Sequence, residues 1–126
     1  MRAVDTNVLV RLLVRDDSQQ VAAAESFVAQ GAWVPKLVLA EVAWVLEAVY
    51  QRTPMQIAAS IEALLNHETL TIQEHEIIQS ALSRFRARPS VEFADCLIVE
   101  IARKSGHLPL GTFDKSLGKL EGTHQL

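Results

Sequence analysis

Short apolar runs alternate with longer helical segments along this chain, and that alternation limits the folds available to it. Strands are predicted at residues 2–5, 32–35, 69–73, 108–114 and, at an edge, 123–126. Helices are predicted at residues 6–14, 18–31, 36–52, 53–66, 74–87 and 92–104. Strands that alternate with helices are typical of a parallel sheet covered on both faces. At this length the sequence predicts one α/β domain over residues 1–126.

Several of these helices carry signals at their ends. Thr6 is predicted to cap the first helix, which runs through Val14. Gly31 follows the second helix, at a position where a left-handed residue commonly ends a helix. Thr53 and Pro54 open the fourth helix, with the proline in the first turn.

The composition is that of an ordinary globular protein. Hydrophobic residues make up 49% of the chain and charged residues 21%, which excludes a disordered chain. The single cysteine, Cys96, cannot form an internal disulfide, which suits a reducing compartment. We find no signal peptide and no apolar stretch of membrane-spanning length. The sequence therefore predicts a cytoplasmic protein that does not enter a membrane.

The charge of the chain is unevenly distributed. The net charge is −3, yet residues 84–126 carry seven Lys or Arg against five Asp or Glu. Such a region can bind phosphates despite the acidic total. The candidates for contacts with a phosphate backbone are Arg11, Arg15, Arg84, Arg86 and Lys115. A solvated surface of mixed charge explains the same pattern at least as well.

Two acids lie at the ends of predicted strands. Asp5 ends the first strand, and Asp114 ends the strand "LPLGTFD". In sheets of this kind, ligands bind beyond the carboxyl ends of the strands, where neighbouring parallel strands bring their last residues to one edge. Each acid, taken alone, is equally typical of a residue that caps the following helix.

Two further acids lie on apolar helix faces. On a helical wheel, Glu41 falls within the arc of Leu37 and Val45, while Asp95 begins the face that continues with Ile98. A buried carboxylate without a partner costs several kcal/mol or takes up a proton. A metal ion or a cationic partner explains Glu41, unless its side chain reaches solvent from the edge of the face. Asp95 also gains from the helix dipole.

The four acids together predict a metal centre. Clustered carboxylates raise each other's pKa values, so a pocket built from Asp5, Glu41, Asp95 and Asp114 calls for a cation. Oxygen ligands without histidine or thiolate favour Mg²⁺ or Mn²⁺. Such a centre is suited to phosphodiester cleavage. Thr112, two residues before Asp114, is placed to bond a carboxylate or a water.

Four segments carry a resemblance to a known family. They are "VDTNVLV" at the N-terminus, "LAEVAWVL" around Glu41, "EFADCLIVEIA" around Asp95 and "GTFDKSLGKL" around Asp114. Their order and spacing over nearly the whole chain resemble the PIN-domain ribonucleases, and in particular the VapC-type toxins of toxin–antitoxin pairs. The resemblance implies a three-layer α/β/α sandwich with a central, mostly parallel sheet, and a Mg²⁺- or Mn²⁺-dependent endoribonuclease.

The resemblance also assigns roles to residues and implies partners. Asp5, Glu41, Asp95 and Asp114 match the metal-binding and catalytic acids, and Asn7 and Thr112 match polar residues that support them. Some relatives carry a further aspartate near the start of the Asp95 helix, where this chain has Glu92, so we keep Glu92 as a supporting candidate. The implied partners are a structured RNA substrate such as tRNA or rRNA, a cognate antitoxin protein and a second copy of the chain.

Three other interpretations remain to be weighed. A phosphatase with Asp5 as nucleophile needs a second acid two residues later, and Asn7 cannot supply the proton. Cys96 has no histidine placed to activate it in sequence and reads as a buried thiol. A catalytically silent module that binds RNA or a protein is the remaining alternative, because intact ligands do not prove turnover.

Overall fold

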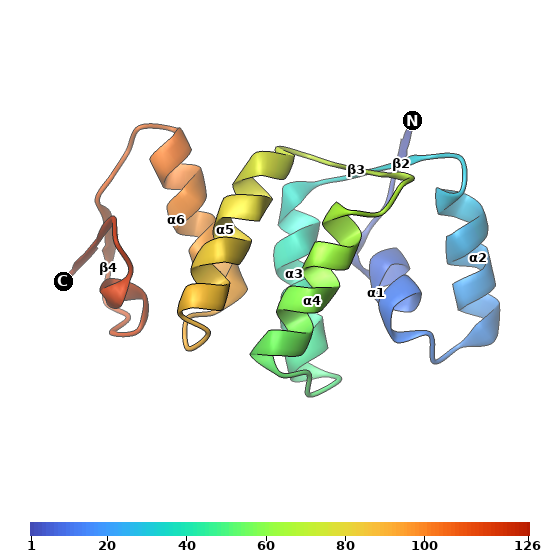
Figure 1. Ribbon diagram of the computed structural model, residues 1–126, viewed down its shortest axis with the longest axis horizontal. Helices are drawn as coiled ribbons and strands as arrows, with labels where there is room; N and C mark the ends of the chain where they lie inside the picture. Colours follow the sequence, from blue (N-terminus) through green and yellow to red (C-terminus); the bar gives the residue numbers. More distant parts are fainter. The chain divides into compact units, whose positions relative to one another are not determined.

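The computed structural model describes residues 1–126, which divide into two compact units, Met1–His75 (unit 1) and Glu76–Leu126 (unit 2). Figure 1 labels the helices and strands of both. Unit 1 contains β1 (Arg2–Ala3), α1 (Thr6–Val14), α2 (Ser18–Val28), β2 (Ala32–Val34), α3 (Lys36–Ala48), α4 (Pro54–Leu65) and β3 (Leu70–Ile72). Unit 2 is formed by α5 (His75–Ala87), α6 (Phe93–Lys104), β4 (Leu110–Thr112), the 3₁₀ helix η1 (Leu117–Lys119) and β5 (Thr123–Gln125).

The sheet of unit 1 is parallel, with the strand order β1-β2-β3. The strand β2 is central, because Ala32 pairs with Arg2 on one side and with Leu70 on the other. Each strand is followed by two helices before the next strand begins. This alternation confirms the predicted α/β class with parallel strands between helices.

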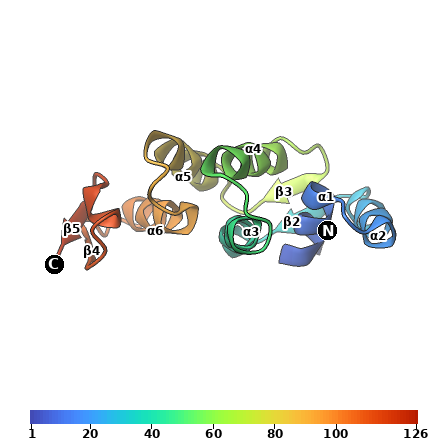
Figure 2. The same cartoon turned by 90° about the horizontal axis from the view of Figure 1, so that it is seen from below.

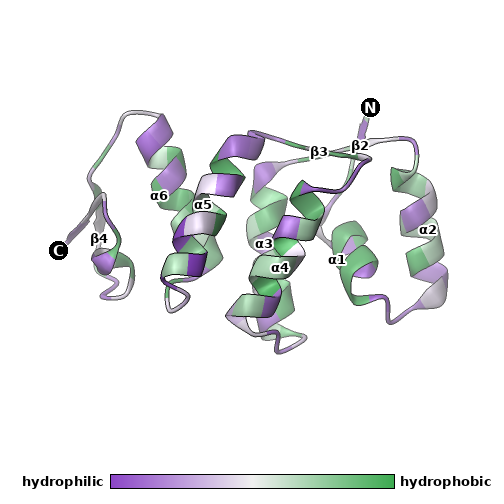
Figure 3. Cartoon of the chain, viewed as in Figure 1, coloured by the Kyte–Doolittle hydropathy of each residue, from purple (hydrophilic) through white to green (hydrophobic).

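The core of unit 1 forms where its helices meet. Leu9 of α1, Leu39 and Val42 of α3, and Ile61 of α4 are completely buried. Contacts join α1 to both α2 and α3, and α3 to α4. Figure 3 shows hydrophobic residues along each of these helices. Removing the hydrophobic sides from water drives this packing.

The predicted helix ends of unit 1 are largely confirmed. Thr53 caps α4 in a capping box with Gln56, and Pro54 occupies the first turn. Gly31 has a φ of 93°, the left-handed conformation that glycine adopts without strain. It lies between the end of α2 and the start of β2, where the chain turns into the sheet.

In unit 2, α5 and α6 are joined by an aromatic pair and by ion pairs. The rings of Phe85 and Phe93 meet edge to face, with centroids 6.0 Å apart. Glu100 of α6 binds Arg84 of α5, and the two helices lie beside each other in Figure 2. β4 and β5 pair in parallel, and Leu110 is opposite Thr123.

The strands of unit 2 can be compared with two strands predicted from the sequence. The C-terminal strand is confirmed at Thr123–Gln125. The strand predicted at residues 108–114 is shorter, at Leu110–Thr112, because Thr112 and Asp114 turn the chain with their side chains. None of the helices in either unit is long and apolar enough to cross a membrane.

Candidate metal centre

Asp5 is the N-cap of α1. Its backbone is extended, and its Oδ1 accepts a hydrogen bond of 3.3 Å from the N–H of Val8. The prediction that Thr6 caps this helix is therefore wrong, since Thr6 is the first helical residue. Asp5 and Asn7 are exposed at this end of α1. The capping bond fixes the position of the Asp5 carboxylate while leaving it open to solvent.

Thr6 instead connects α1 to α3. Its hydroxyl donates a hydrogen bond of 2.8 Å to Oε2 of Glu41. Glu41 is exposed, as are Leu37 and Trp44 at 66% and 62%, so the prediction that Glu41 lies on the core-facing side of its helix is wrong. The buried side of α3 carries Val42 instead, which is completely buried.

Asp95 and Asp114 interact electrostatically in unit 2. Asp95 lies in the first turn of α6 and is half-buried. Its pKa is raised, chiefly by burial and further by the negative charge of Asp114. The repulsion by Asp114 favours a cation beside Asp95, because a cation offsets the charges of the two carboxylates.

The Asp114 carboxylate is oriented by backbone N–H groups. Its Oδ1 accepts hydrogen bonds from the N–H groups of Ser116 at 2.8 Å and Leu117 at 3.0 Å. The hydroxyl of Thr112 accepts a bond of 3.0 Å from the N–H of Asp114. Thr112 thus supports Asp114 through the backbone of the turn.

Two neighbours of Asp95 have separate roles. Glu92 is the exposed N-cap residue of α6, and no hydrogen bond from its side chain caps the helix. Cys96 is completely buried, and burial, with a smaller contribution from the charge of Asp95, raises the pKa of its thiol to about 11. The interpretation of Cys96 as a buried thiol is confirmed, because almost no thiolate exists at neutral pH.

Three of the basic candidates form internal ion pairs. Arg11 pairs with Asp16 and also donates a hydrogen bond of 2.7 Å to the hydroxyl of Tyr50. Arg15 pairs with Glu25 at 3.3 Å. Arg84 binds Glu100, whereas Arg86 and Lys115 are exposed. Contacts of these five basic residues with an RNA backbone stay a prediction.

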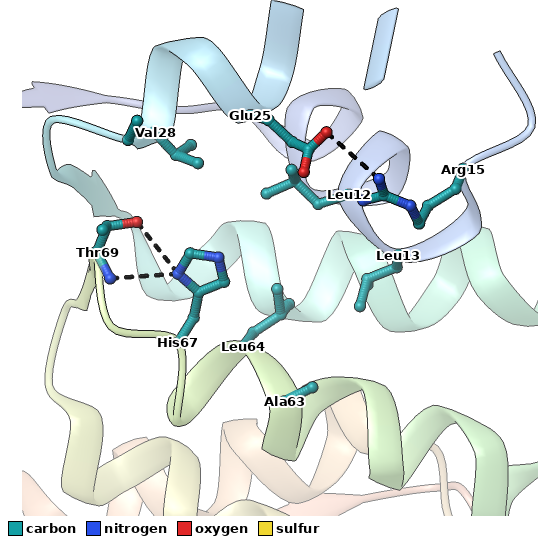
Figure 4. Close-up of a pocket in the computed structure, with 10 residues that line it drawn as sticks. Leu12, Leu13, Arg15, Glu25, Val28, Ala63, Leu64, His67 and Thr69 are labelled. Atoms are coloured by element: carbon teal, nitrogen blue, oxygen red, sulfur yellow. Dashed lines mark hydrogen bonds and ion pairs between the residues drawn. The ribbon is translucent and has the colours of Figure 1, made fainter. Parts of the chain in front are cut away.

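The pocket drawn in Figure 4 lies within unit 1. It has a volume of about 400 Å³, and its lining includes Leu12, Leu64 and the Arg15–Glu25 ion pair. None of the four predicted acids lines it. No group of three or more His, Cys, Asp or Glu side chains is arranged to hold a metal ion. Each unit carries two of the four acids, and the metal centre stays a prediction.

A model of the PIN domain matches residues 2–122, nearly the whole chain. The chain therefore belongs to the PIN domain family, a family of nucleases that are typically Mg²⁺-dependent. The match extends over both units. No curated protein and no solved structure matches the chain.

Sequence reasoning missed two contributors to the arrangement around the acids. One is Thr6, whose contact with Glu41 spans 35 positions of the sequence. The other is the turn formed by Ser116 and Leu117, which holds Asp114. The turn had a local signal, because an aspartate often binds the N–H two residues later. The Thr6 contact had none, since it depends on the packing of α1 against α3.

Proposed function

We propose that this chain is a Mg²⁺- or Mn²⁺-dependent endoribonuclease and the toxin of a type II toxin–antitoxin pair. Membership of a nuclease family supports the cleavage of phosphodiester bonds. The toxin role rests on the four sequence segments that resemble VapC-type toxins. In this proposal Asp5, Glu41, Asp95 and Asp114 are the metal ligands, with Asn7, Thr112 and Glu92 in support.

Membership of a family of typically Mg²⁺-dependent nucleases carries the metal dependence, and the position of Asp95 is consistent with it. Its carboxylate is half-buried and close enough to Asp114 for the two charges to repel. Carboxylate oxygens are the ligands that Mg²⁺ and Mn²⁺ prefer, so these residues fit such an ion. An ion held by these carboxylates would supply the chemistry that activates a water and offsets charge on the scissile phosphate.

The protein contributes fixed positions for the carboxylates. The capping bond of Asp5 holds one, and the hydroxyl of Thr6 holds that of Glu41. The N–H groups of Ser116 and Leu117 hold that of Asp114. Ligands held in this way lose less entropy when an ion binds, because their orientations are already restricted.

The proposed partners follow from the same function. A structured RNA, such as a tRNA or a ribosomal RNA, is the substrate, and exposed basic residues such as Lys115 contact its backbone. A cognate antitoxin silences the enzyme by presenting a basic side chain to the acids. The chain acts in the cytoplasm as a homodimer.

Two substitutions of Asp5 separate catalysis from folding. Asn caps a helix as well as Asp does, so Asp5→Asn should leave the free energy of unfolding within about 0.5 kcal/mol of the wild type. It removes a charged ligand, however, so cleavage of RNA should fall at least a hundredfold. Asp5→Ala should lose cleavage and, in addition, about 1 kcal/mol of stability with the cap.

The assay is cleavage of total RNA by purified protein with Mg²⁺, Mn²⁺ or EDTA, followed by sequencing of the RNA ends. The proposal predicts metal-dependent cleavage at few sites, and none with Asp5→Asn. Cleavage that persists in EDTA and in Asp5→Asn would refute the metal mechanism. Tight RNA binding without products under either metal would favour the silent binding module instead.

A further inference from the structure

Arg84 connects three segments of unit 2. Its Nε donates to Oε1 of Glu100 at 2.5 Å, and its Nη1 donates to the backbone carbonyl of Glu121 at 2.8 Å. Arg84 lies on α5, Glu100 lies on α6, and Glu121 lies between η1 and β5. One guanidinium therefore ties both helices to the C-terminal segment.

Glu100 fixes the orientation of that guanidinium. It is the only buried charged residue of the chain, with 3% of its surface exposed. Its second oxygen accepts a hydrogen bond of 2.7 Å from Nε of Arg103. A buried carboxylate requires such partners, and the planar guanidinium of Arg84 can satisfy it in few orientations. Nη1 is thereby directed at the carbonyl of Glu121.

The segment that Arg84 binds also carries Asp114. The N–H of Gly118 donates to the carbonyl of Asp114 at 2.9 Å, and the N–H of Leu110 donates to the carbonyl of Gly122 at 2.8 Å. These bonds link β4, η1 and the turn that contains Glu121 into one piece. Backbone hydrogen bonds within this segment therefore connect the region of Glu121 to Asp114.

The other end of the connection is the helix of Asp95. Asp95 precedes Glu100 by five residues on α6, so both move with the same helix. Arg84 thus joins the element that carries Asp95 to the segment that carries Asp114. Its side chain is 20% exposed, which suits an internal connection better than a phosphate contact.

We propose that Arg84 is a positioning residue that sets the separation of the Asp95 and Asp114 carboxylates and, through it, the affinity for a divalent metal. The inference rests on the proposed function, because it takes these two acids as metal ligands. Lysine cannot take over this role. Arg84 binds Glu100 through Nε and the carbonyl of Glu121 through Nη1 of one planar guanidinium, and a single ammonium group does not reproduce this geometry.

Arg84→Lys is tested against Arg103→Lys as a matched control. Both variants keep the charge and change a residue that binds Glu100, but Arg103 is 49% exposed and lies on the same helix as Glu100. The affinity for Mn²⁺ is measured from the electron paramagnetic resonance signal of the free ion. Exchange of the Leu117 and Gly118 amides is followed by NMR on the same full-length samples.

Arg84→Lys should weaken Mn²⁺ binding about tenfold and speed exchange of both amides, as expected for the loss of a residue that orients metal ligands. Arg103→Lys should change neither by more than about twofold, because it leaves the bond to Glu121 in place. If Arg84→Lys does not fold, Glu100→Gln gives a comparison that leaves Arg84 in place, since the single acceptor oxygen of the amide can serve only one of the two guanidinium groups.

The outcomes separate this inference from the proposed function. Unchanged Mn²⁺ affinity in Arg84→Lys, with or without faster amide exchange, overturns the positioning role alone. A wild-type protein that binds Mn²⁺ but cleaves no RNA overturns the proposed function and leaves the positioning role supported by the tenfold loss. A wild-type protein that binds no Mn²⁺ overturns both.

Discussion

Replacing the buried Glu100 by glutamine should destabilise the protein strongly. In the wild type the Glu100 carboxylate accepts hydrogen bonds from Arg84 at 2.5 Å and from Arg103 at 2.7 Å. In the variant the glutamine amide retains one acceptor oxygen and presents an NH₂ group to the other guanidinium. A hydrogen bond to a charged group contributes about 1.5–3 kcal/mol. The half-exposed guanidinium of Arg103 can form a hydrogen bond to water in the variant, so we expect the free energy of unfolding to fall by about 2–3 kcal/mol in total.

Thermal unfolding followed by circular dichroism measures this loss, which corresponds to roughly 10 °C in Tm for a chain of this size. Glu76→Gln is the control, because Glu76 pairs with Lys104 while 66% exposed and should cost no more than about 0.5 kcal/mol. A loss from Glu100→Gln as small as that of the control would refute the argument that the paired, buried carboxylate stabilises unit 2.

The pH dependence of Glu100→Gln follows from the pKa of the glutamate. Burial is the largest influence and raises that pKa, but the hydrogen bonds and charges of Arg84 and Arg103 outweigh it, so the pKa is lowered. A lowered pKa contributes stability above the pKa of the unfolded chain and loses it as pH falls through the folded value. The difference between wild type and variant should therefore persist at neutral pH and shrink in acid.

Three further predictions concern the acids of the metal centre. Asp95→Asn should stabilise the metal-free protein at neutral pH but not at a pH below the ordinary range of Asp pKa values. The reason is that the pKa of Asp95 is raised in the folded protein, which costs the wild type stability as pH rises. Equal stabilisation at every pH, measured by denaturant titration, would contradict this. Thr6→Val should release Glu41 and weaken Mn²⁺ binding severalfold, whereas Thr6→Ser should retain it, as an Mn²⁺ titration would show. Millimolar Mg²⁺ or Mn²⁺ should raise the Tm of the wild type, and an unchanged Tm would count against metal binding by the folded protein.

Local sequence patterns were sufficient to find the helices of this protein. The capping box of Thr53 and the left-handed Gly31 act within one or two turns of chain, so their effect can be read without knowing the fold. The alternation of strands and helices is also visible in the sequence without knowledge of the fold, and it predicted the parallel pairing. The boundary at Thr112 was missed because two side chains turn the backbone where apolar residues continue.

The face that a helix buries could not be read in the same way. A helical wheel shows that Leu37, Glu41 and Val45 share one side of α3, but it does not show which side another helix covers. In the structure α1 packs against α3, Val42 is buried and Leu37 is 66% exposed. The predicted burial of Glu41 failed for this reason, so the prediction of Glu41 as a functional acid rests on the family resemblance alone.

The sequence by itself determined the α/β class, the order of the elements, the inventory of four acids and, through motif order, the family. Tertiary structure alone decided the long-range contacts of Glu41 and of Arg84. Thr6 reaches Glu41 across 35 positions, and Arg84 reaches Glu100 and Glu121 across 16 and 37. Such contacts depend on how helices pack, and packing is a property of the whole chain that no local pattern encodes.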